Sequence, residues 1–239
     1  MPESAINNSF SLPLSVKMVM IDLDGTLIHT APDLAASANR MLEDLDMPTH
    51  PQDQVERWIG NGVARLVKRA LTGQMQAEPE AALFDQAYTK FLEHYARSVS
   101  ALSRPYPGVV EGLNALKEAG FELACITNKA ESFTLPLLKD LQLHDYFGLI
   151  LSGDSLPKKK PDPLPLLHAC EYFQITPDHG VLVGDSANDT QAAQAAGMPA
   201  VCVSYGYSQG VDVRGLGAQA VIDSLEELPQ YIQRYSTQA

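Results

Sequence analysis

Three observations on the sequence predict a doubly wound α/β fold with a parallel sheet and a helical insert. Five short apolar segments recur along the chain, and each is bounded by turn or polar residues. Segments with apolar residues at helical spacing separate them, which is typical of strand–helix–strand units. Residues 31–103 instead hold successive helical patterns, so we expect a helical insert after the first strand.

The expected strands are short and apolar, because strands of a parallel sheet are buried on both faces. They cover residues 18–23 (MVMIDL), 122–127 (ELACIT), 149–152 (LILS), 181–183 (VLV) and 199–203 (PAVCV). Helices are expected over residues 109–119, 131–141, 164–173 and 189–196. Gly120 and Gly197 follow the first and last of these helices, where glycine commonly ends a helix.

The insert carries helix-start signals of its own. Pro32 lies near the start of its first helical pattern, Pro51 precedes the second and Gly62 precedes the third, while residues 78–98 predict a long last helix. The flanking segments LIHTAP and SRPYPGV contain the proline and glycine that suit hinges. We therefore expect an N-terminal tail over residues 1–16, a core of residues 17–29 and 105–239, and a cap over residues 30–104.

Composition limits the kinds of protein that this chain can be. Its 239 residues, 45% of them hydrophobic, suffice for one large or two modest domains. A net charge of −12 argues against a general nucleic-acid binder, so any anionic substrate must meet locally concentrated positive charge. The three cysteines, Cys125, Cys170 and Cys202, have neither paired nor metal-type spacing and are expected to be buried, reduced thiols.

The N-terminal residues match no export signal, because they contain Glu3, two prolines and no continuous apolar run. No segment approaches the roughly 18 apolar residues of a membrane helix. We therefore expect a cytoplasmic protein without a membrane partner, either a monomer or a small homo-oligomer.

The first chemical motif, DLDGT, follows the first expected strand and places Asp22 and Asp24 at its carboxyl end. Ligands of open α/β sheets bind at that edge. A calcium-binding EF-hand loop is one alternative, but its sixth and twelfth positions need Gly and Glu, and here they are Leu27 and Asp33. An ordinary acidic turn is the second alternative.

Two further segments bring hydrogen-bond donors to the same edge of the sheet. The second strand ends in Thr127-Asn128-Lys129, although Thr127 taken alone is better explained as a helix cap. The run from Lys158 to Lys160 is, for its first two lysines, best interpreted as a solvated basic segment. Lys160 lies against the turn at Pro161, which can aim it inward.

The fourth segment, GDSAND, again lies between an apolar strand and a helix. It brings Asp185 and Asp189 to the same sheet edge. A helix cap is an alternative explanation for Asp189 but a weaker one for Asp185.

These four segments, in this order and at strand ends, resemble the sequence motifs of the haloacid dehalogenase superfamily over about residues 17–203. The helical insert resembles that family's cap domain. The resemblance implies that Asp22 is the nucleophile that attacks phosphorus, and that Asp24 first protonates the leaving oxygen and then activates water. It also implies that Thr127 and Asn128 bind phosphate oxygens and that Lys160 neutralises their charge and steadies Asp22.

The resemblance further implies a divalent cation, held by Asp22, the main-chain carbonyl of Asp24 and Asp185, with Asp189 in support. Four carboxylates around a phosphate would repel one another without such a cation. Oxygen ligands favour magnesium over zinc, so Mg²⁺ is the expected cofactor.

Within the superfamily, the chain resembles the bacterial phosphoglycolate phosphatases through segments such as WIGNGVARLVKRAL and SGDSLPKKKPDPLPLLHAC. That resemblance implies a small substrate with both a phosphate and a carboxylate. Arg65, just after the glycine-rich turn at residues 60–62, is the expected carboxylate contact, whereas Lys68 and Arg69 are expected to solvate a helix face. Trp58 is expected in the core of the cap, and His29 near the site.

Three alternatives remain open at this point. A phosphomutase of the same superfamily uses the same residues on sugar phosphates, and a related phosphatase acts on another small phosphate ester or on pyrophosphate. A signalling receiver domain also combines a phosphorylated Asp with a Thr, a Lys and magnesium. The position of Asp22 and the helical insert oppose the receiver.

Overall fold

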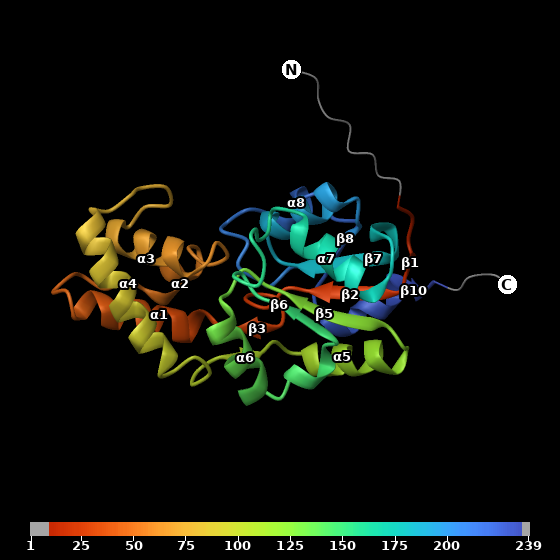
Figure 1. The fold of residues 1–239 in the computed structure, drawn as a ribbon, viewed down its shortest axis with the longest axis horizontal. Helices are drawn as coiled ribbons and strands as arrows, with labels where there is room; N and C mark the ends of the chain where they lie inside the picture. Colours follow the sequence, from red (N-terminus) through yellow and green to blue (C-terminus); the bar gives the residue numbers. More distant parts are fainter. Residues whose placement is uncertain (1–9, 236–239) are drawn as a thin grey trace, which may run out of the picture.

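The computed structural model describes residues 10–235 and arranges them in two lobes that lie side by side (Figure 1). One lobe consists of the helices α1 to α4, and the other contains the main sheet with the remaining helices on its two faces. This is the α/β fold with a helical insertion that the sequence predicts.

The main sheet has six parallel strands in the order β6-β5-β2-β7-β8-β9. Their bounds are Met18–Ile21 for β2, Glu122–Ile126 for β5, Leu149–Leu151 for β6, Gly180–Gly184 for β7, Ala200–Val203 for β8 and Ala220–Ile222 for β9. Five of these strands are the expected ones, and β9 is an addition. The first strand of the chain to enter this sheet, β2, lies at its centre between β5 and β7, so three motif-bearing strands are neighbours.

Both faces of the sheet are buried, because side chains alternate along each strand. Val19 and Ile21 belong to one hydrophobic cluster, together with residues of α5 and α6. Met18 and Met20 belong to a second cluster, together with residues of α7 and α8. The helices span Val109–Glu118 (α5), Glu131–Asp140 (α6), Leu164–Phe173 (α7) and Ala187–Ala196 (α8). The sheet is therefore covered on both sides, and its turns at the strand ends remain free for chemistry.

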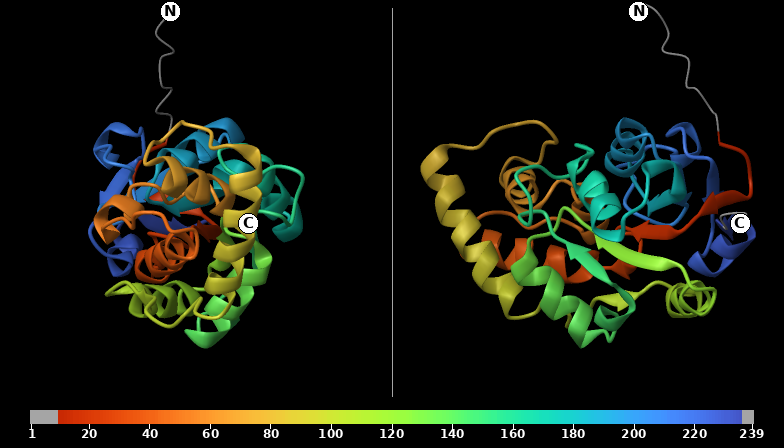
Figure 2. Two further views of the ribbon diagram at one scale, coloured as in Figure 1. Left: turned by 90° about the vertical axis from the view of Figure 1, so that its left-hand side faces the viewer. Right: turned by 45° about the vertical axis from the view of Figure 1, so that its right-hand side comes forward.

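The cap lobe is helical, as the sequence predicts. Its helices span Ala31–Glu43 (α1), Gln52–Glu56 (α2), Val63–Thr72 (α3) and Ala81–Ala96 (α4), and the described part of the chain has no strand between residues 31 and 103. Figure 2 shows these helices packed against one another beside the sheet. Trp58, Phe91 and Tyr95 are buried in this lobe, so the expectation for Trp58 is confirmed.

The two segments that join the lobes pair with each other. Strand β3 (Ile28–His29) runs antiparallel to β4 (Arg104–Pro105). Next to this ribbon, the buried carboxylate of Asp33 accepts hydrogen bonds from the main chain of Leu102 and Ser103. Asp33, the twelfth position of the calcium-loop alternative, thus contacts a linker, and the structure contradicts that alternative.

The N-terminal expectation needs correction. Residues 1–9 lie outside the described residues, but β1 (Leu14–Val16) pairs in parallel with β10 (Ile232–Arg234) at the end of the core far from the cap (Figure 1). The apolar Leu14 and Val16 are buried, which explains why this part of the expected tail is a strand. Four short 3₁₀ helices complete the described chain: His144–Tyr146 (η1), Pro177–His179 (η2), Val213–Gly215 (η3) and Leu225–Gln230 (η4).

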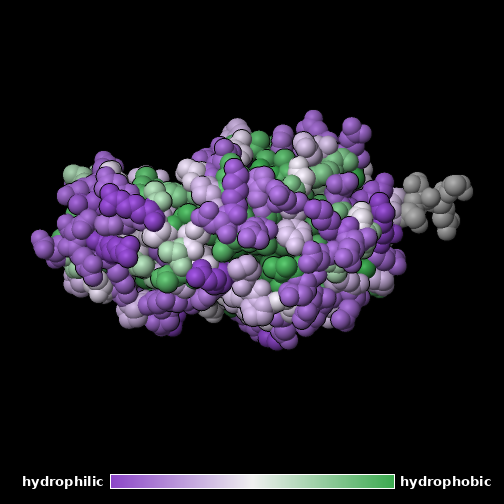
Figure 3. Space-filling view, turned by 90° about the horizontal axis from the view of Figure 1, so that it is seen from below, coloured by the Kyte–Doolittle hydropathy of each residue, from purple (hydrophilic) through white to green (hydrophobic). Residues whose placement is uncertain are grey.

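The surface seen from below is mostly hydrophilic over both lobes, and its apolar areas are small and separate (Figure 3). Among the helices of residues 10–235, none combines the length and apolar character that crossing a membrane requires. All three cysteines are free and buried, as expected.

Candidate active site

A pocket lies between the lobes at the carboxyl ends of β2, β5 and β7. Its floor comes from the core and its roof from the cap. The core residues are Asp22, Asp24, Thr127, Asn128, Lys129, Lys160, Ser186, Asn188 and Asp189, and the cap residues are Leu34, Ile59, Gly60, Gly62, Val63 and Leu66. The structure therefore brings together residues from all four sequence motifs.

Lys160 is the centre of the buried charge network. Its ammonium lies 2.7 Å from Asp22 Oδ1 and 2.6 Å from Asp189 Oδ1, and it also donates to the carbonyl of Ile126. Only 3% of the residue is exposed. Burial lowers the pKa of Lys160, but Asp189 and Asp22 outweigh burial and raise it above its ordinary value, so the ammonium stays charged.

Asp22, Asp185 and Asp189 form a group suited to a cation. Each offers one carboxylate oxygen, and these oxygens lie within 4.8 Å of one another. All three residues are buried. One lysine cannot neutralise three carboxylates, so a divalent ion with oxygen ligands fits the charge and the chemistry of this group.

The electrostatics of Asp22 support the same conclusion. Burial raises the pKa of Asp22 to about 7, and the neighbouring Asp189 adds to the rise while Lys160 opposes it. A cation at this group would favour the ionised carboxylate. A bound divalent ion would therefore keep Asp22 in the form that a nucleophile requires.

Asp185 lies in a tight cradle of main chain. Its Oδ2 accepts a hydrogen bond from the amide of Tyr207, and a Cβ atom at Gly25 or Gly206 would overlap its side chain. Gly25 has a φ of +88°, so glycine suits this turn for two reasons. Burial, followed by the charges of Asp189 and Asp22, raises the pKa of Asp185 well above its ordinary value.

Asp189 has a structural task as well. Helix α8 begins two residues earlier than expected, its N-cap is Ser186, and Asp189 completes a capping box. Oδ2 of Asp189 accepts from the Ser186 amide and hydroxyl at 3.1 and 2.8 Å, while Oδ1 faces Lys160. The helix-cap explanation is thus correct for Asp189, and it leaves this carboxylate less free for a metal than that of Asp22 or Asp185.

Asp24 does not join this carboxylate group. Its side chain pairs instead with Lys129, whose Nζ lies 3.1 Å from Asp24 Oδ1. The same ammonium donates to the hydroxyl of Tyr95 at 2.5 Å. Burial lowers the pKa of Lys129, but Asp24 and then Tyr95 outweigh burial and raise it, so this second lysine also stays charged.

Thr127 and Asn128 lie at the end of β5, on the floor of the pocket. Thr127 is not the N-cap of α6, which is Ala130; its hydroxyl accepts from the amide of Lys129. The side-chain amide of Asn128 donates to the carbonyls of Gly60 and Lys160. These residues thus border the carboxylates, as the sequence predicts.

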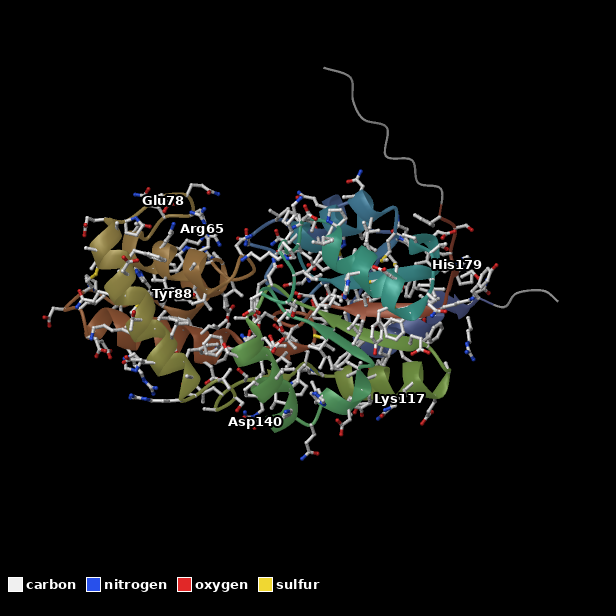
Figure 4. All side chains as sticks on the ribbon, viewed as in Figure 1. Arg65, Glu78, Tyr88, Lys117, Asp140 and His179 are labelled. Carbon is white, nitrogen blue, oxygen red and sulfur yellow. The ribbon has the colours of Figure 1, made fainter. Side chains whose placement is uncertain are left out.

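Arg65 does not line the Asp22 pocket, and its guanidinium pairs with Glu78 at 2.9 Å, beside it on the cap (Figure 4). It lines a neighbouring cavity together with Asn128 and Lys160, so its contact with a substrate carboxylate stays a prediction. Lys68 binds the carboxylate of Glu78 as well, so neither cation is simply solvated. Arg69 is only 3% exposed and donates to the carbonyls of Trp58 and Met75 and to the side chain of Asn61. Arg69 therefore holds the glycine-rich turn in shape.

The glycine-rich turn contacts the core through its main-chain carbonyls. The carbonyl of Ile59 accepts from Gln209, the carbonyl of Gly60 from Asn128 and Asn188, and that of Asn61 from Lys159. Lys158 and Lys159 are both exposed, as expected, but Lys159 also reaches the cap.

Three residues of the site are not among those that the sequence predicts. Lys129 stands directly after Thr127 and Asn128, and its place at a strand end was the available signal. Tyr95 and Gln209 lie far from every motif, so only the tertiary structure reveals them. His29, expected near the site, lies 3.5 Å from Glu56 and does not line the pocket.

Comparisons with known proteins agree with this geometry. Residues 19–203 match the family of haloacid dehalogenase-like hydrolases. A phosphoglycolate phosphatase of Thiobacillus denitrificans is 59% identical over 217 residues, which cover 91% of this chain and 96% of that protein. A phosphoglycolate phosphatase of Nitrosospira multiformis is 54% identical over 224 residues, or 94% and 99% of the two chains. A crystal structure from Haemophilus somnus 129PT, described as a predicted phosphoglycolate phosphatase, has a TM-score of 0.84 and 34% identity over 90% of this chain and 96% of that one.

Proposed function

The chain belongs to the haloacid dehalogenase-like hydrolase family, and we propose that it is a phosphoglycolate phosphatase, which hydrolyses 2-phosphoglycolate to glycolate and phosphate. One observation carries this function: the 59% identity to a phosphoglycolate phosphatase extends over 91% of the chain. With 217 of the 239 residues matched, most of the cap at residues 30–104 and most of the core at residues 17–29 and 105–239 lie within the match. The cap supplies the roof of the pocket, where substrates are distinguished.

In the first step, a carboxylate oxygen of Asp22 attacks phosphorus and the bond from phosphorus to the glycolate oxygen breaks. Asp24 donates its proton to that leaving oxygen, which gives glycolate and an aspartyl-phosphate on Asp22. Thr127 and the main chain of Asn128 bind the phosphoryl oxygens. Lys160, 2.7 Å from Asp22, orients the nucleophile and stabilises the negative charge.

In the second step, a water oxygen attacks phosphorus and the bond between phosphorus and Asp22 breaks. Asp24, now a carboxylate, accepts the proton of the water and is ready to act as an acid again. The proton that leaves Asp24 in the first step is thus replaced in the second, and the enzyme returns to its starting state.

Magnesium is the cofactor that the site fits best. Asp22 and Asp185 would hold it, with the main-chain carbonyl of Asp24, and Asp189 would support them from its place beside Lys160. Bound there, Mg²⁺ would supply positive charge for the phosphoryl group and keep Asp22 ionised.

The roof of the pocket is apolar. It includes the side chains of Leu34, Ile59, Val63 and Leu66. The 59% identity to a phosphoglycolate phosphatase is what favours 2-phosphoglycolate over the substrate of a phosphomutase. We propose that the substrate carboxylate contacts the glycine-rich turn at residues 60–62, whose main chain lies in the roof, on the side of the pocket where Arg65 lines the neighbouring cavity.

A phosphate-release assay tests this function. We expect 2-phosphoglycolate to give the highest kcat/KM among 2-phosphoglycolate, hexose phosphates, pyrophosphate and nucleotides, and we expect excess chelator to abolish turnover until magnesium is restored. Asp22→Asn removes the nucleophile, so phosphate release is expected to fall by at least about 1,000-fold.

The control is Asp140→Asn, on the exposed surface of α6, where the carboxylate binds only Ser100 among the described side chains (Figure 4). This variant is expected to retain wild-type turnover. Preference for a hexose phosphate would contradict the substrate, and full activity in Asp22→Asn would contradict the mechanism.

A further inference from the structure

A second buried lysine lies in the pocket, and the reaction steps above give it no role. Lys129 Nζ contacts both carboxylate oxygens of Asp24, at 3.1 and 3.4 Å, and the hydroxyl of Tyr95 at 2.5 Å. Its side chain is 2% exposed, and that of Asp24 is 15% exposed. Both residues line the pocket, and Asp24 is the more exposed of the two.

We propose that Lys129 is a positioning residue for Asp24, and that Tyr95 of the cap fixes the ammonium in place. The acid–base group of the core is then oriented through a side chain of the cap. This inference rests on the acid–base role assigned to Asp24 under the proposed function.

The two buried lysines of the site contact different carboxylates. Lys160 contacts Asp22 and Asp189, the nucleophile and its neighbour. Lys129 contacts Asp24 alone among the carboxylates of the described residues. Each lysine thus serves a different carboxylate, and loss of Lys129 leaves the pairing of Asp22 intact.

Tyr95 can hold the ammonium of Lys129 in place because its ring packs against aromatic rings of both lobes. It is fully buried near the end of α4, with its ring centroid 5.6 Å from that of Phe91 in the cap and 4.8 Å from that of Phe133 on the core helix α6. Its hydroxyl can therefore reach Lys129 only while the cap and the core are packed together. The contact couples cap closure to the orientation of Asp24.

The physical effect of Lys129 concerns the leaving oxygen. When Asp24 gives its proton to an alkoxide-like leaving group, a carboxylate forms, and the adjacent ammonium stabilises that charge and holds the carboxylate toward the pocket. A leaving group that departs as a stable anion needs no proton. The loss of Lys129 should then affect poor leaving groups far more than good ones.

Three small phosphate compounds separate the possible roles of Lys129. 2-Phosphoglycolate has a poor leaving group and a carboxylate, ethyl phosphate has a poor leaving group without a carboxylate, and acetyl phosphate has a good leaving group. The quantity to measure is kcat/KM for phosphate release, because it reports the steps up to departure of the leaving group.

For Lys129→Met we expect kcat/KM to fall about 100-fold on 2-phosphoglycolate and on ethyl phosphate, but less than about 5-fold on acetyl phosphate. Tyr95→Phe keeps the ring and removes the hydroxyl, so we expect the same selective pattern at about 3- to 10-fold. The matched controls are Lys117→Met, on the exposed side of α5, and Tyr88→Phe, on the same helix as Tyr95, and both should resemble the wild type (Figure 4).

An equal fall in kcat/KM on all three compounds in Lys129→Met would overturn the proposal, since Lys129 would then have only a structural role. No fall on any compound would also overturn it, since Lys129 would then have no role in the reaction. A loss confined to 2-phosphoglycolate would also overturn it, because Lys129 would then bind the substrate carboxylate. If a thermal melt shows that Lys129→Met is not folded, the changes in kcat/KM of Tyr95→Phe on the three compounds decide between these outcomes. If the wild type prefers another ester, the proposed substrate fails, while ethyl and acetyl phosphate still test Lys129.

Discussion

At the scale of single residues, Lys160 shows how one side chain serves both stability and chemistry. Its ammonium lies between Asp22 and Asp189 in a buried site, where removing one partner of a charge network leaves the others without compensation. The same contact orients Asp22 for attack. Stability and activity are therefore expected to fall together when this lysine is lost.

Lys160→Met is expected to lower the free energy of unfolding by about 3 kcal/mol and kcat by at least about 100-fold. The loss of stability should be larger without magnesium, because the cation would otherwise compensate the unpaired carboxylates. Urea denaturation with and without chelator, together with phosphate release, measures both effects.

The control for that measurement is Lys158→Met, which replaces a lysine two residues before Lys160. The Lys158 ammonium forms an exposed pair with Asp162 at 2.9 Å, and such pairs contribute about 0–1 kcal/mol. The role given to Lys160 would be wrong if the two variants were equally stable and equally active.

At the scale of elements, the joint between the lobes is a short ribbon clamped by the first helix of the cap. Strands β3 and β4 pair with each other, and Asp33 in the first turn of α1 holds the chain just before β4. Its carboxylate accepts from the Ser103 amide at 2.7 Å and from the Ser103 hydroxyl at 2.6 Å. The two linkers therefore behave as one connection rather than as two independent hinges.

Asp33→Ala is expected to lower the free energy of unfolding by about 2–4 kcal/mol, because it leaves the buried amide of Ser103 and the partly buried amide of Leu102 without an acceptor. Urea denaturation followed by circular dichroism provides the measurement. Asp53→Ala removes an exposed carboxylate that pairs with Arg57 at 3.3 Å, and it should change stability by less than about 0.5 kcal/mol. Similar urea midpoints for Asp33→Ala and Asp53→Ala would argue against the role of Asp33 in holding the linker.

At the scale of the whole molecule, the cap is held over the pocket through its main chain. Three successive carbonyls, those of residues 59–61, accept hydrogen bonds from core side chains, and one donor is Gln209 at 2.8 Å from the carbonyl of Ile59. Carbonyl acceptors do not depend on the side chains of the turn. Glycine at positions 60 and 62, each with positive φ, lets the turn approach the core closely.

Gln209→Ala removes two hydrogen bonds between the core and this turn, one to the carbonyl of Ile59 and one to the side chain of Asn61, and is expected to favour an open cap. Amide hydrogen exchange of residues 59–62 should become about 5- to 10-fold faster, in line with the loss of about 1 kcal/mol of hydrogen bonding. Gln230→Ala, an exposed glutamine at the end of η4, is the control. Unchanged exchange in Gln209→Ala would mean that the turn does not hold the cap.

The sequence by itself determined five of the six strands of the main sheet, the helical insert and the motif residues Asp22, Asp24, Thr127, Lys160, Asp185 and Asp189, because these depend on local patterns. A short apolar run predicts a buried strand, and parallel strands bring their carboxyl ends to one edge. The convergence of these residues on one pocket follows from that rule.

The tertiary structure alone decided the partners of the remaining residues. The strands β1, β3, β4, β9 and β10 have two or three residues each, and they exist because distant segments pair with them. Arg65 pairs with Glu78, and Lys129 donates to Tyr95 across the two lobes. Such contacts join residues far apart in sequence, and their geometry depends on how the lobes pack, which no local pattern encodes.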